Sequence, residues 1–201
     1  LMKKYNVRVA HNPGSNMKLA SGIAPVHKML QAGLCVGLGT DGASSNNNLD
    51  MLEELRLATL LHKVNTLDPL VVPAYEGVLM ATKYGAEAVG LKDTVGILAE
   101  GYKADITLFD TNNLWWTPQN DKISLLAYSA NSSQVDTVIV NGKILMNKGQ
   151  LLTMDEEKIL YEQTHNIDKA GHYFNIVDKN YTLTGFSHNN QKHNLNMYTW
   201  G

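Results

Sequence analysis

The 201-residue chain has the composition of an ordinary soluble globular protein, with 44% hydrophobic and 18% charged residues. Its formal net charge is -2 without a long run of one sign, so the sequence favours neither a nucleic-acid nor a membrane-surface partner. No stretch approaches the roughly 18 apolar residues of a membrane span. The charge balance leaves small neutral or zwitterionic ligands open as partners. The single cysteine, Cys35, excludes an intrachain disulfide and is typical of a reducing compartment, so we expect a cytoplasmic protein.

The first predicted element is a short strand. The chain starts at Leu1 as though in the middle of a helix, so we expect a truncated sequence. Residues 7–11 then alternate and include β-branched side chains, which predicts a strand that ends at His11. The Asn-Pro-Gly sequence at 12–14 is a turn signal.

A helix and a second strand follow. Residues 23–33 place apolar side chains at helical spacing and finish with Gly33, a residue suited to the end of a helix. The apolar run 34–38 favours a strand buried on both faces, although a buried helical segment would have the same pattern. Strand, helix and strand in this order predict a right-handed βαβ unit with parallel strands. Because parallel strands end at the same edge, His11 and Asp41 are expected to face one cleft.

Two longer helices are predicted next. Ser45 or an asparagine at 46–48 would cap a helix over residues 49–64, whose first turn carries Asp50 and two glutamates. Residues 73–90 are rich in small side chains and end at a glycine, which predicts a second helix with close packing.

The C-terminal half has a different pattern. Short strands are predicted within residues 96–110 and 135–146, and the second segment contains Asn141-Gly142, a strong hairpin signal. A helix is predicted over 155–171. From residue 173 onwards Asn, His, Lys and Tyr accumulate without apolar periodicity, so we expect a poorly ordered tail.

Three motifs together resemble a known enzyme family. They are His11-Asn-Pro-Gly-Ser-Asn-Met-Lys-Leu-Ala-Ser-Gly-Ile-Ala-Pro-Val26, Gly39-Thr-Asp-Gly-Ala-Ser-Ser-Asn-Asn47 and Gly96-Ile-Leu-Ala-Glu-Gly-Tyr-Lys-Ala-Asp105. Over roughly residues 1–170, their order and spacing resemble the C-terminal half of an amidohydrolase-superfamily deaminase. The resemblance is greatest to the 5-methylthioadenosine/S-adenosylhomocysteine deaminases, with their triazine-hydrolase relatives.

The resemblance implies an α/β fold that combines the C-terminal part of a metal-dependent (β/α)8 hydrolase barrel with part of a small β-sandwich. Together with the residue pattern of the C-terminal segments, it predicts four parts, which are a partial barrel over residues 1–94, a β-sandwich segment over 95–150, a C-terminal helix over 151–172 and a polar tail over 173–201. The tail has no counterpart in the family. It also implies one divalent metal, zinc or iron, and a small nucleoside substrate.

Asp41 and His11 are the candidate site residues. In the family that the chain resembles, the aspartate of the Gly-Thr-Asp-Gly motif binds the metal and accepts a proton from the activated water, and Asp41 matches it. The histidine of the His-Asn-Pro motif polarises that water or holds the substrate, and His11 matches it. From position alone, Asp41 could equally be a turn or helix-cap acid, and His11 could cap a turn.

The family pattern also contains residues that have no match here. It includes a His-x-His pair, a further metal-binding histidine and a general-acid glutamate, whereas the seven histidines of this chain contain no His-x-His. One carboxylate and one imidazole do not make the three-ligand metal site of a mononuclear hydrolase. We therefore expect the chain alone to be inactive and to need an upstream half or an oligomer.

Two functional hypotheses follow. In the first, the chain is part of an aminohydrolase that deaminates S-adenosylhomocysteine or 5-methylthioadenosine. In the second, it is a non-catalytic remnant or interaction fragment that keeps only the fold signature.

Several other conspicuous side chains have plainer interpretations than a role in chemistry. We expect turn formation by Ser15 and Asn16, structural or solvated positions for His27 and His62, core packing by Cys35, and a hydrophobic plug or a stacking surface at Trp115-Trp116.

Overall fold

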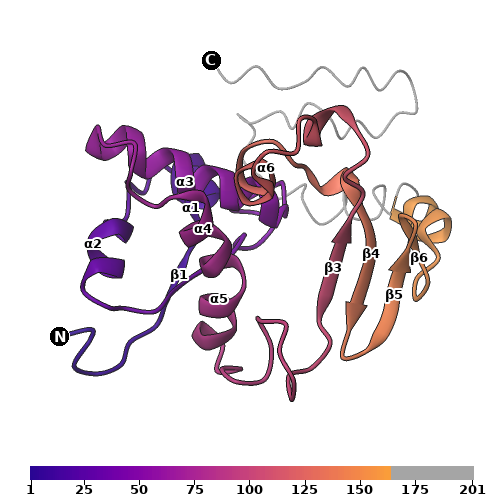
Figure 1. The fold of residues 1–201 in the computed structure, drawn as a ribbon, viewed down its shortest axis with the longest axis horizontal. Helices are drawn as coiled ribbons and strands as arrows, with labels where there is room; N and C mark the ends of the chain where they lie inside the picture. The colour runs from indigo at the N-terminus through magenta and orange to yellow at the C-terminus, as the bar shows by residue number, and fades with distance from the viewer. Residues whose placement is uncertain (164–201) are drawn as a thin grey trace, which may run out of the picture. The chain divides into compact units, whose positions relative to one another are not determined.

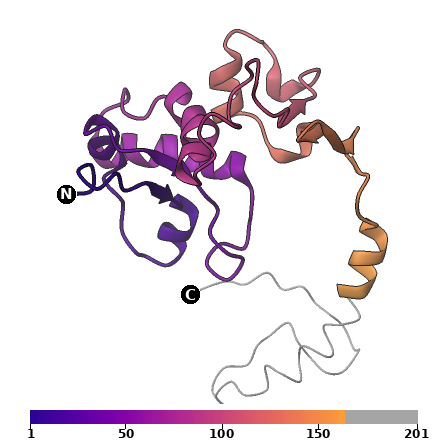
Figure 2. The same ribbon diagram turned by 90° about the horizontal axis from the view of Figure 1, so that it is seen from below.

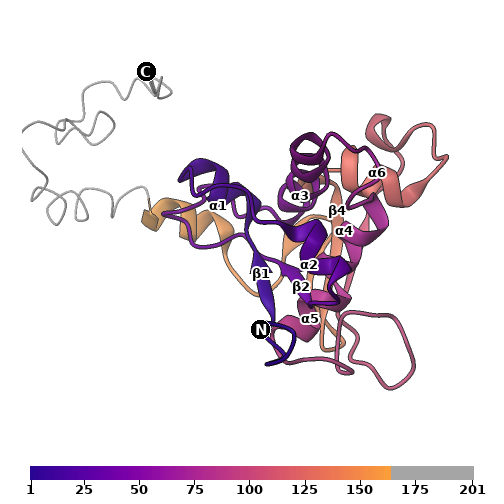
Figure 3. The same ribbon diagram turned by 90° about the vertical axis from the view of Figure 1, so that its left-hand side faces the viewer.

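Two short parallel strands organise the N-terminal part of the computed structural model, which describes residues 1–163 (Figure 1). Strand β1 (Val9–His11) pairs with β2 (Val36–Leu38), in a register that places His11 opposite Leu38. Two helices lie between them in the chain, one where a helix was predicted and one additional, so the predicted βαβ order is confirmed, although both strands are shorter than expected. Figures 2 and 3 show the neighbouring helices gathered around this strand pair.

The helices next to the strands differ in length from those predicted. Helix α1 (Pro13–Lys18) occupies a segment for which the sequence predicted only a turn. Proline also suits the first turn of a helix, because the N–H that it lacks would have no partner there. Helix α2 (Val26–Gln31) is shorter than the predicted 23–33, and Gly33 follows its end with a φ of 73°, as expected.

Helix α3 (Met51–Thr66) confirms the long helix but corrects its cap. The N-cap is Asp50, rather than Ser45 or an asparagine at 46–48. Its Oδ1 accepts hydrogen bonds from two backbone N–H groups of the first turn, at 2.8 and 3.3 Å. The helix therefore starts after the acid that the sequence pattern had placed inside it.

The single helix predicted over 73–90 is two helices, α4 (Ala74–Ala81) and α5 (Lys83–Ala88). The break falls at Thr82, whose φ and ψ are -122° and -92°. Its hydroxyl donates to the carbonyl of Val78 at 2.7 Å, a local hydrogen bond that competes with regular helix geometry.

The apolar core lies where these helices meet strand β2. Its buried side chains form two groups, Val26, Val36, Val72 and Met80 in one, and Leu55, Ala74 and Ala127 in the other. Packing is closest at Gly37 on β2, where a Cβ would lie 2.9 Å from the Cα of Gly85 on α5. The strand therefore requires a glycine at this contact with the helix.

A four-stranded sheet follows, in the order β3-β4-β5-β6 (Figure 1). The strands are β3 (Ile106–Phe109), β4 (Val135–Val140), β5 (Lys143–Asn147) and β6 (Gln150–Leu151). The pairs β3–β4 and β4–β5 are antiparallel. Asn141 and Gly142 connect β4 to β5 with φ angles of 50° and 77°, which confirms the predicted primed hairpin turn.

Between β3 and β4 lie three short elements that were not predicted: η1 (Leu114–Trp116), α6 (Lys122–Tyr128) and η2 (Ser132–Gln134). Trp116 is buried, and its indole N–H donates to Oε1 of Gln134 at 3.0 Å. Trp115 is 58% exposed. The two neighbouring tryptophans therefore have opposite environments, one in the interior and one at the surface.

Contacts divide the chain into two units, residues 1–150 and 151–201. In the second unit residues 156–163 are helical, within the helix predicted over 155–171. The remainder of that helix and the tail predicted over 173–201 lie outside the described residues. Among the helices that the structure describes, none is long and apolar enough to cross a membrane.

Candidate functional site

Asp41 lies three residues after β2, on the loop that leads to α3. Its φ is 62°, in the left-handed region that aspartate adopts more readily than most residues. Both carboxylate oxygens accept a hydrogen bond at 2.7 Å, Oδ2 from the hydroxyl of Ser15 and Oδ1 from the N–H of Gly42. These two bonds hold the carboxylate in one direction. The residue is exposed, so the carboxylate is still open to solvent.

These hydrogen bonds also set the charge of Asp41. The pKa of the Asp41 carboxyl lies below its usual value, because the Ser15 hydroxyl and, with a smaller effect, the Gly42 amide donate hydrogen bonds to it. The group is therefore a carboxylate at neutral pH, which can bind a cation or accept a proton. The expectation of turn formation is wrong for Ser15, which lies in α1 and directs its hydroxyl at Asp41.

His11 ends β1 and is buried, with 2% of its surface exposed. Its Nε2 lies 3.2 Å from Nε2 of His62 on α3, so one nitrogen donates a proton and the other accepts it. Within residues 1–163, no hydrogen bond joins the His11 imidazole to Asp41. Both predicted site residues lie at the carboxyl ends of the paired strands, His11 as the last residue of β1 and Asp41 three residues after β2. Their side chains are held by different partners.

The imidazole pair of His11 and His62 is uncharged at neutral pH. The pKa of His11 is lowered to about 4, mainly by burial and to a smaller extent by the charge of His62. The pKa of His62 is also lowered, mainly by burial and to a smaller extent by the charge of His27. The sequence predicted that His62 is either structural or solvated. Because its side chain is buried against His11, the structural alternative is the correct one.

A third buried side chain, Glu54 on α3, connects the loops that follow the two strands. Its Oε2 accepts the N–H of Gly14 at 2.9 Å, and its Oε1 accepts the side-chain amide of Asn46 at 2.7 Å. The same amide donates to the carbonyl of Thr40 at 3.0 Å. Burial raises the pKa of the Glu54 carboxyl, and the bonds from Gly14 and Asn46 oppose that rise.

Sequence reasoning placed Glu54 in the first turn of this helix, as the structure does, but it missed the burial of Glu54 and gave neither Glu54 nor His62 a partner. Helix α3 buries five side chains, Glu54, Leu55, Ala58, Thr59 and His62. Residues four apart share a helix face, so Glu54, Ala58 and His62 form one row beside Leu55. This spacing was the available signal, because two ionisable groups occur on a face that apolar residues mark as buried.

The fit of a divalent metal to these residues is partial. Asp41 offers an anionic oxygen, whereas His11 and His62 direct their Nε2 atoms at each other. In the described part of the chain, no group of three or more His, Cys, Asp or Glu is arranged to hold a metal ion. Residues 1–163 therefore supply one suitable ligand rather than a complete catalytic site.

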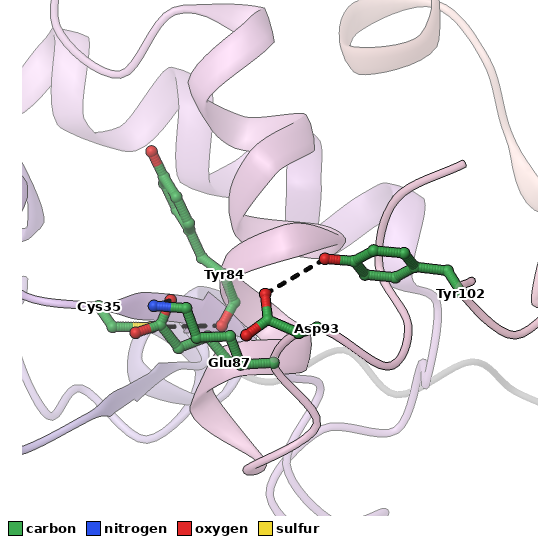
Figure 4. A network of polar contacts seen from close by, with 6 residues as sticks. Cys35, Tyr84, Glu87, Asp93 and Tyr102 are labelled. Carbon is green, nitrogen blue, oxygen red and sulfur yellow. Dashed lines mark hydrogen bonds and ion pairs between the residues drawn. The ribbon is translucent and has the colours of Figure 1, made fainter. Parts of the chain in front are cut away.

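Cys35 lies away from this site, just before β2. Its thiol donates to the carbonyl of Tyr84 at 3.3 Å, and Figure 4 shows this bond together with the hydrogen bond from the Tyr102 hydroxyl to Asp93 at 3.2 Å. Burial raises the pKa of the thiol, so it is protonated at neutral pH. This agrees with the packing role predicted for Cys35.

An open cleft of about 500 Å³ lies at the break between α4 and α5. Its lining is mostly apolar and includes Thr82, Gly96 and Ile106. Neither Asp41 nor His11 lines it, so the cleft is separate from the candidate site.

Comparison with known proteins gives consistent matches. The Amidohydrolase family profile matches residues 1–145. The 5-methylthioadenosine/S-adenosylhomocysteine deaminase of Pelotomaculum thermopropionicum is 59% identical over 162 residues, which cover 81% of this chain and 37% of that protein. The chain thus spans a little over a third of that relative's length.

Two solved structures have a similar fold. An adenosine deaminase from Xanthomonas campestris with bound zinc matches with a TM-score of 0.82 and 34% identity, over 85% of this chain and 39% of that one. The atrazine chlorohydrolase of Arthrobacter aurescens, complexed with zinc, matches with a TM-score of 0.74 and 32% identity, over 81% of this chain and 36% of that one.

Proposed function

Because the chain belongs to the amidohydrolase family, we propose that it is part of a metal-dependent aminohydrolase that deaminates an adenosine-derived thioether. The observation that carries this proposal is the Asp41 carboxylate, which is ionised, exposed and held by Ser15 and Gly42 at the end of β2. The names of the 59% identical relative and of the Xanthomonas enzyme support an adenine nucleoside substrate. S-Adenosylhomocysteine and 5-methylthioadenosine are the proposed candidates.

The proposal includes an assignment of the chain to parts of the fold. Residues 1–94 belong to the C-terminal part of a (β/α)8 barrel and residues 95–150 to a β-sandwich segment. The parallel pair β1–β2 with its helices supports the first assignment. The antiparallel sheet that begins at β3 supports the second.

Asp41 has two roles in the proposed mechanism. Each of its oxygens keeps a lone pair beyond the bond from Ser15 or Gly42, so one can bind a divalent metal while the other accepts a proton from water. Zinc, present in both similar solved structures, is the proposed metal, and when bound it lowers the pKa of water to about 7. The remaining ligands come from outside residues 1–163.

His11 keeps its expected role as part of the proposal. Its Nε2 faces His62, so a contact with the attacking water or the substrate uses Nδ1. The low pKa of His11 makes this contact that of a neutral imidazole, which orients a polar group without adding charge.

The test is a deamination assay with S-adenosylhomocysteine and 5-methylthioadenosine. The reaction is monitored through the change in ultraviolet absorbance as adenine becomes hypoxanthine. It compares the 201-residue chain with a version extended upstream to the length of the relatives. We expect the extended protein to convert at least one substrate, and the chain alone to convert neither.

Asp41→Asn is the variant that tests the mechanism, because it keeps the side-chain shape but removes the negative charge. Asp93→Asn is its matched control, since Asp93 is also exposed and has the same φ of 62°. We expect activity to be lost in the first variant and retained in the second. Activity retained in Asp41→Asn would show that the assigned role is wrong, and an extended protein that binds zinc but converts neither substrate would favour the non-catalytic alternative.

A further inference from the structure

The most unusual polar group outside the proposed chemistry is the Glu54 carboxylate. It is 1% exposed, and its hydrogen-bond partners within residues 1–163 are two neutral donors, the N–H of Gly14 and the amide of Asn46. Removing a carboxylate from water is costly, and an apolar side chain of similar volume usually stabilises a core at least as well. Stability alone therefore gives a poor reason for an acid at this position.

One oxygen of Glu54 sets the position of the serine that holds Asp41. Glu54 Oε2 accepts the N–H of Gly14 at 2.9 Å, and the next residue, Ser15, donates to Asp41 Oδ2 at 2.7 Å. The approach is so close that a Cβ on Gly14 would lie 2.2 Å from Glu54 Oε1. The placement of the Ser15 hydroxyl therefore depends on the Glu54 carboxylate.

The other oxygen of Glu54 acts on the backbone next to Asp41. Glu54 Oε1 accepts the amide of Asn46 at 2.7 Å, and that amide also donates to the carbonyl of Thr40 at 3.0 Å. Thr40 immediately precedes Asp41, so this bond restrains the backbone at the start of the left-handed residue. Glu54 thus acts on Asp41 in two places: on the Asp41 side chain through Ser15, and on the Asp41 backbone through Asn46 and Thr40.

From these contacts we propose that Glu54 and Asn46 are positioning residues for the Asp41 carboxylate. They act through Ser15 and Thr40 and do not touch the reacting groups themselves. The catalytic consequence rests on the proposed function, whereas the geometric part concerns this chain alone. A buried acid with a purely structural role would instead change stability without changing the direction of the Asp41 carboxylate.

Glu54→Gln is the informative variant, because glutamine keeps the side-chain volume but has one acceptor oxygen in place of two. It can accept from Gly14 or from Asn46, but not from both in the present geometry. Glu53→Gln is the matched control, since Glu53 is the preceding residue on α3 and bonds neither of these donors. Asn46→Ala is a second test should Glu54→Gln fail to fold, because it leaves the bond between Glu54 and Gly14 in place.

The readout is the amide signal of Gly42 in the NMR spectrum of the 201-residue chain. This N–H donates to Asp41 Oδ1 at 2.7 Å, so its chemical shift and hydrogen exchange report the direction of the carboxylate. We expect Glu54→Gln and Asn46→Ala to move the signal and accelerate exchange, and Glu53→Gln to change neither. A Gly42 signal that stays in place in Asn46→Ala and in folded Glu54→Gln overturns the proposal, whatever their thermal stability.

Kinetics of the extended protein give the second readout. We expect Glu54→Gln and Asn46→Ala to lower kcat about 10-fold with little change in KM, as is typical when support for a metal-binding carboxylate is lost. An unchanged kcat would overturn the catalytic part of the inference. If the extended wild type has no deaminase activity, the proposed function fails, and the Gly42 signal still decides whether Glu54 positions Asp41.

Discussion

Acid should destabilise the folded N-terminal unit through the buried pair of His11 and His62. The pKa of His11 is about 4 in the folded chain and 6.5 for an exposed imidazole, so the unfolded chain binds this proton more tightly. The contribution of His11 to stability is therefore fully present above pH 6.5. It is lost progressively as the pH falls towards 4. His62, whose pKa is also lowered, acts in the same direction.

The size of the effect follows from these two pKa values. Between about pH 7.5 and about pH 5, proton linkage at His11 alone removes about 2 kcal/mol from the free energy of unfolding, and the loss reaches about 3 kcal/mol at about pH 4. For a unit of about 150 residues, a loss of about 2 kcal/mol lowers Tm by about 4–8 °C.

Urea denaturation at both pH values measures this loss, and His11→Gln removes the titrating group. Histidines outside the pair are common to both proteins, so the difference between their pH dependences reports the titration of His11 together with its effect on His62. His27→Gln is the control, because it removes another imidazole of the same unit and keeps the hydrogen bond between His11 and His62, while it removes only the second of the two causes that lower the pKa of His62. Equal pH dependence in the wild type and His11→Gln, or an NMR titration of His11 near 6.5, would refute the reasoning.

Two further predictions concern stability, and urea denaturation measures both. Gly37→Ala should destabilise the fold by about 1–3 kcal/mol, because its Cβ would lie 2.9 Å from backbone on α5. Gly42→Ala, whose Cβ would meet open space, should change stability by less than about 0.5 kcal/mol, and equal costs would contradict the packing at β2. Trp116→Phe should cost about 1–2 kcal/mol, because Gln134 loses the indole donor. Trp115→Phe, on an exposed ring, should be near neutral, and the opposite ranking would show that the two environments are misassigned.

The strand pair and the acid that follows it could be predicted because they depend on local patterns. An apolar run that stops at a polar loop indicates a buried strand, and the order of strand, helix and strand gives the parallel pairing. The hairpin at Asn141-Gly142 is equally local, since these residue types adopt positive φ most readily. That His11 and Asp41 share one cleft stays a prediction, because the described contacts connect each to a different partner.

The partners of the site could not be predicted because they come from distant parts of the chain. His11 meets His62, 51 positions away, and Gly14 meets Glu54, 40 positions away. Polar side chains on a helix usually face solvent, and only the elements packed against α3 decide which of them are buried. The break at Thr82 has a related cause, because the choice between a local side-chain bond and a continuous helix depends on the surrounding packing.

The left-handed backbone at Asp41 limits how the site could be redesigned. Such a conformation costs most residue types about 1–2 kcal/mol, whereas glycine, asparagine and aspartate tolerate it. Glutamate would keep the charge but would lose that tolerance, and its longer side chain would carry the carboxylate away from the Ser15 hydroxyl. Engineering for a different metal or substrate would therefore succeed more readily through the residues around Asp41 than through exchange of Asp41 itself.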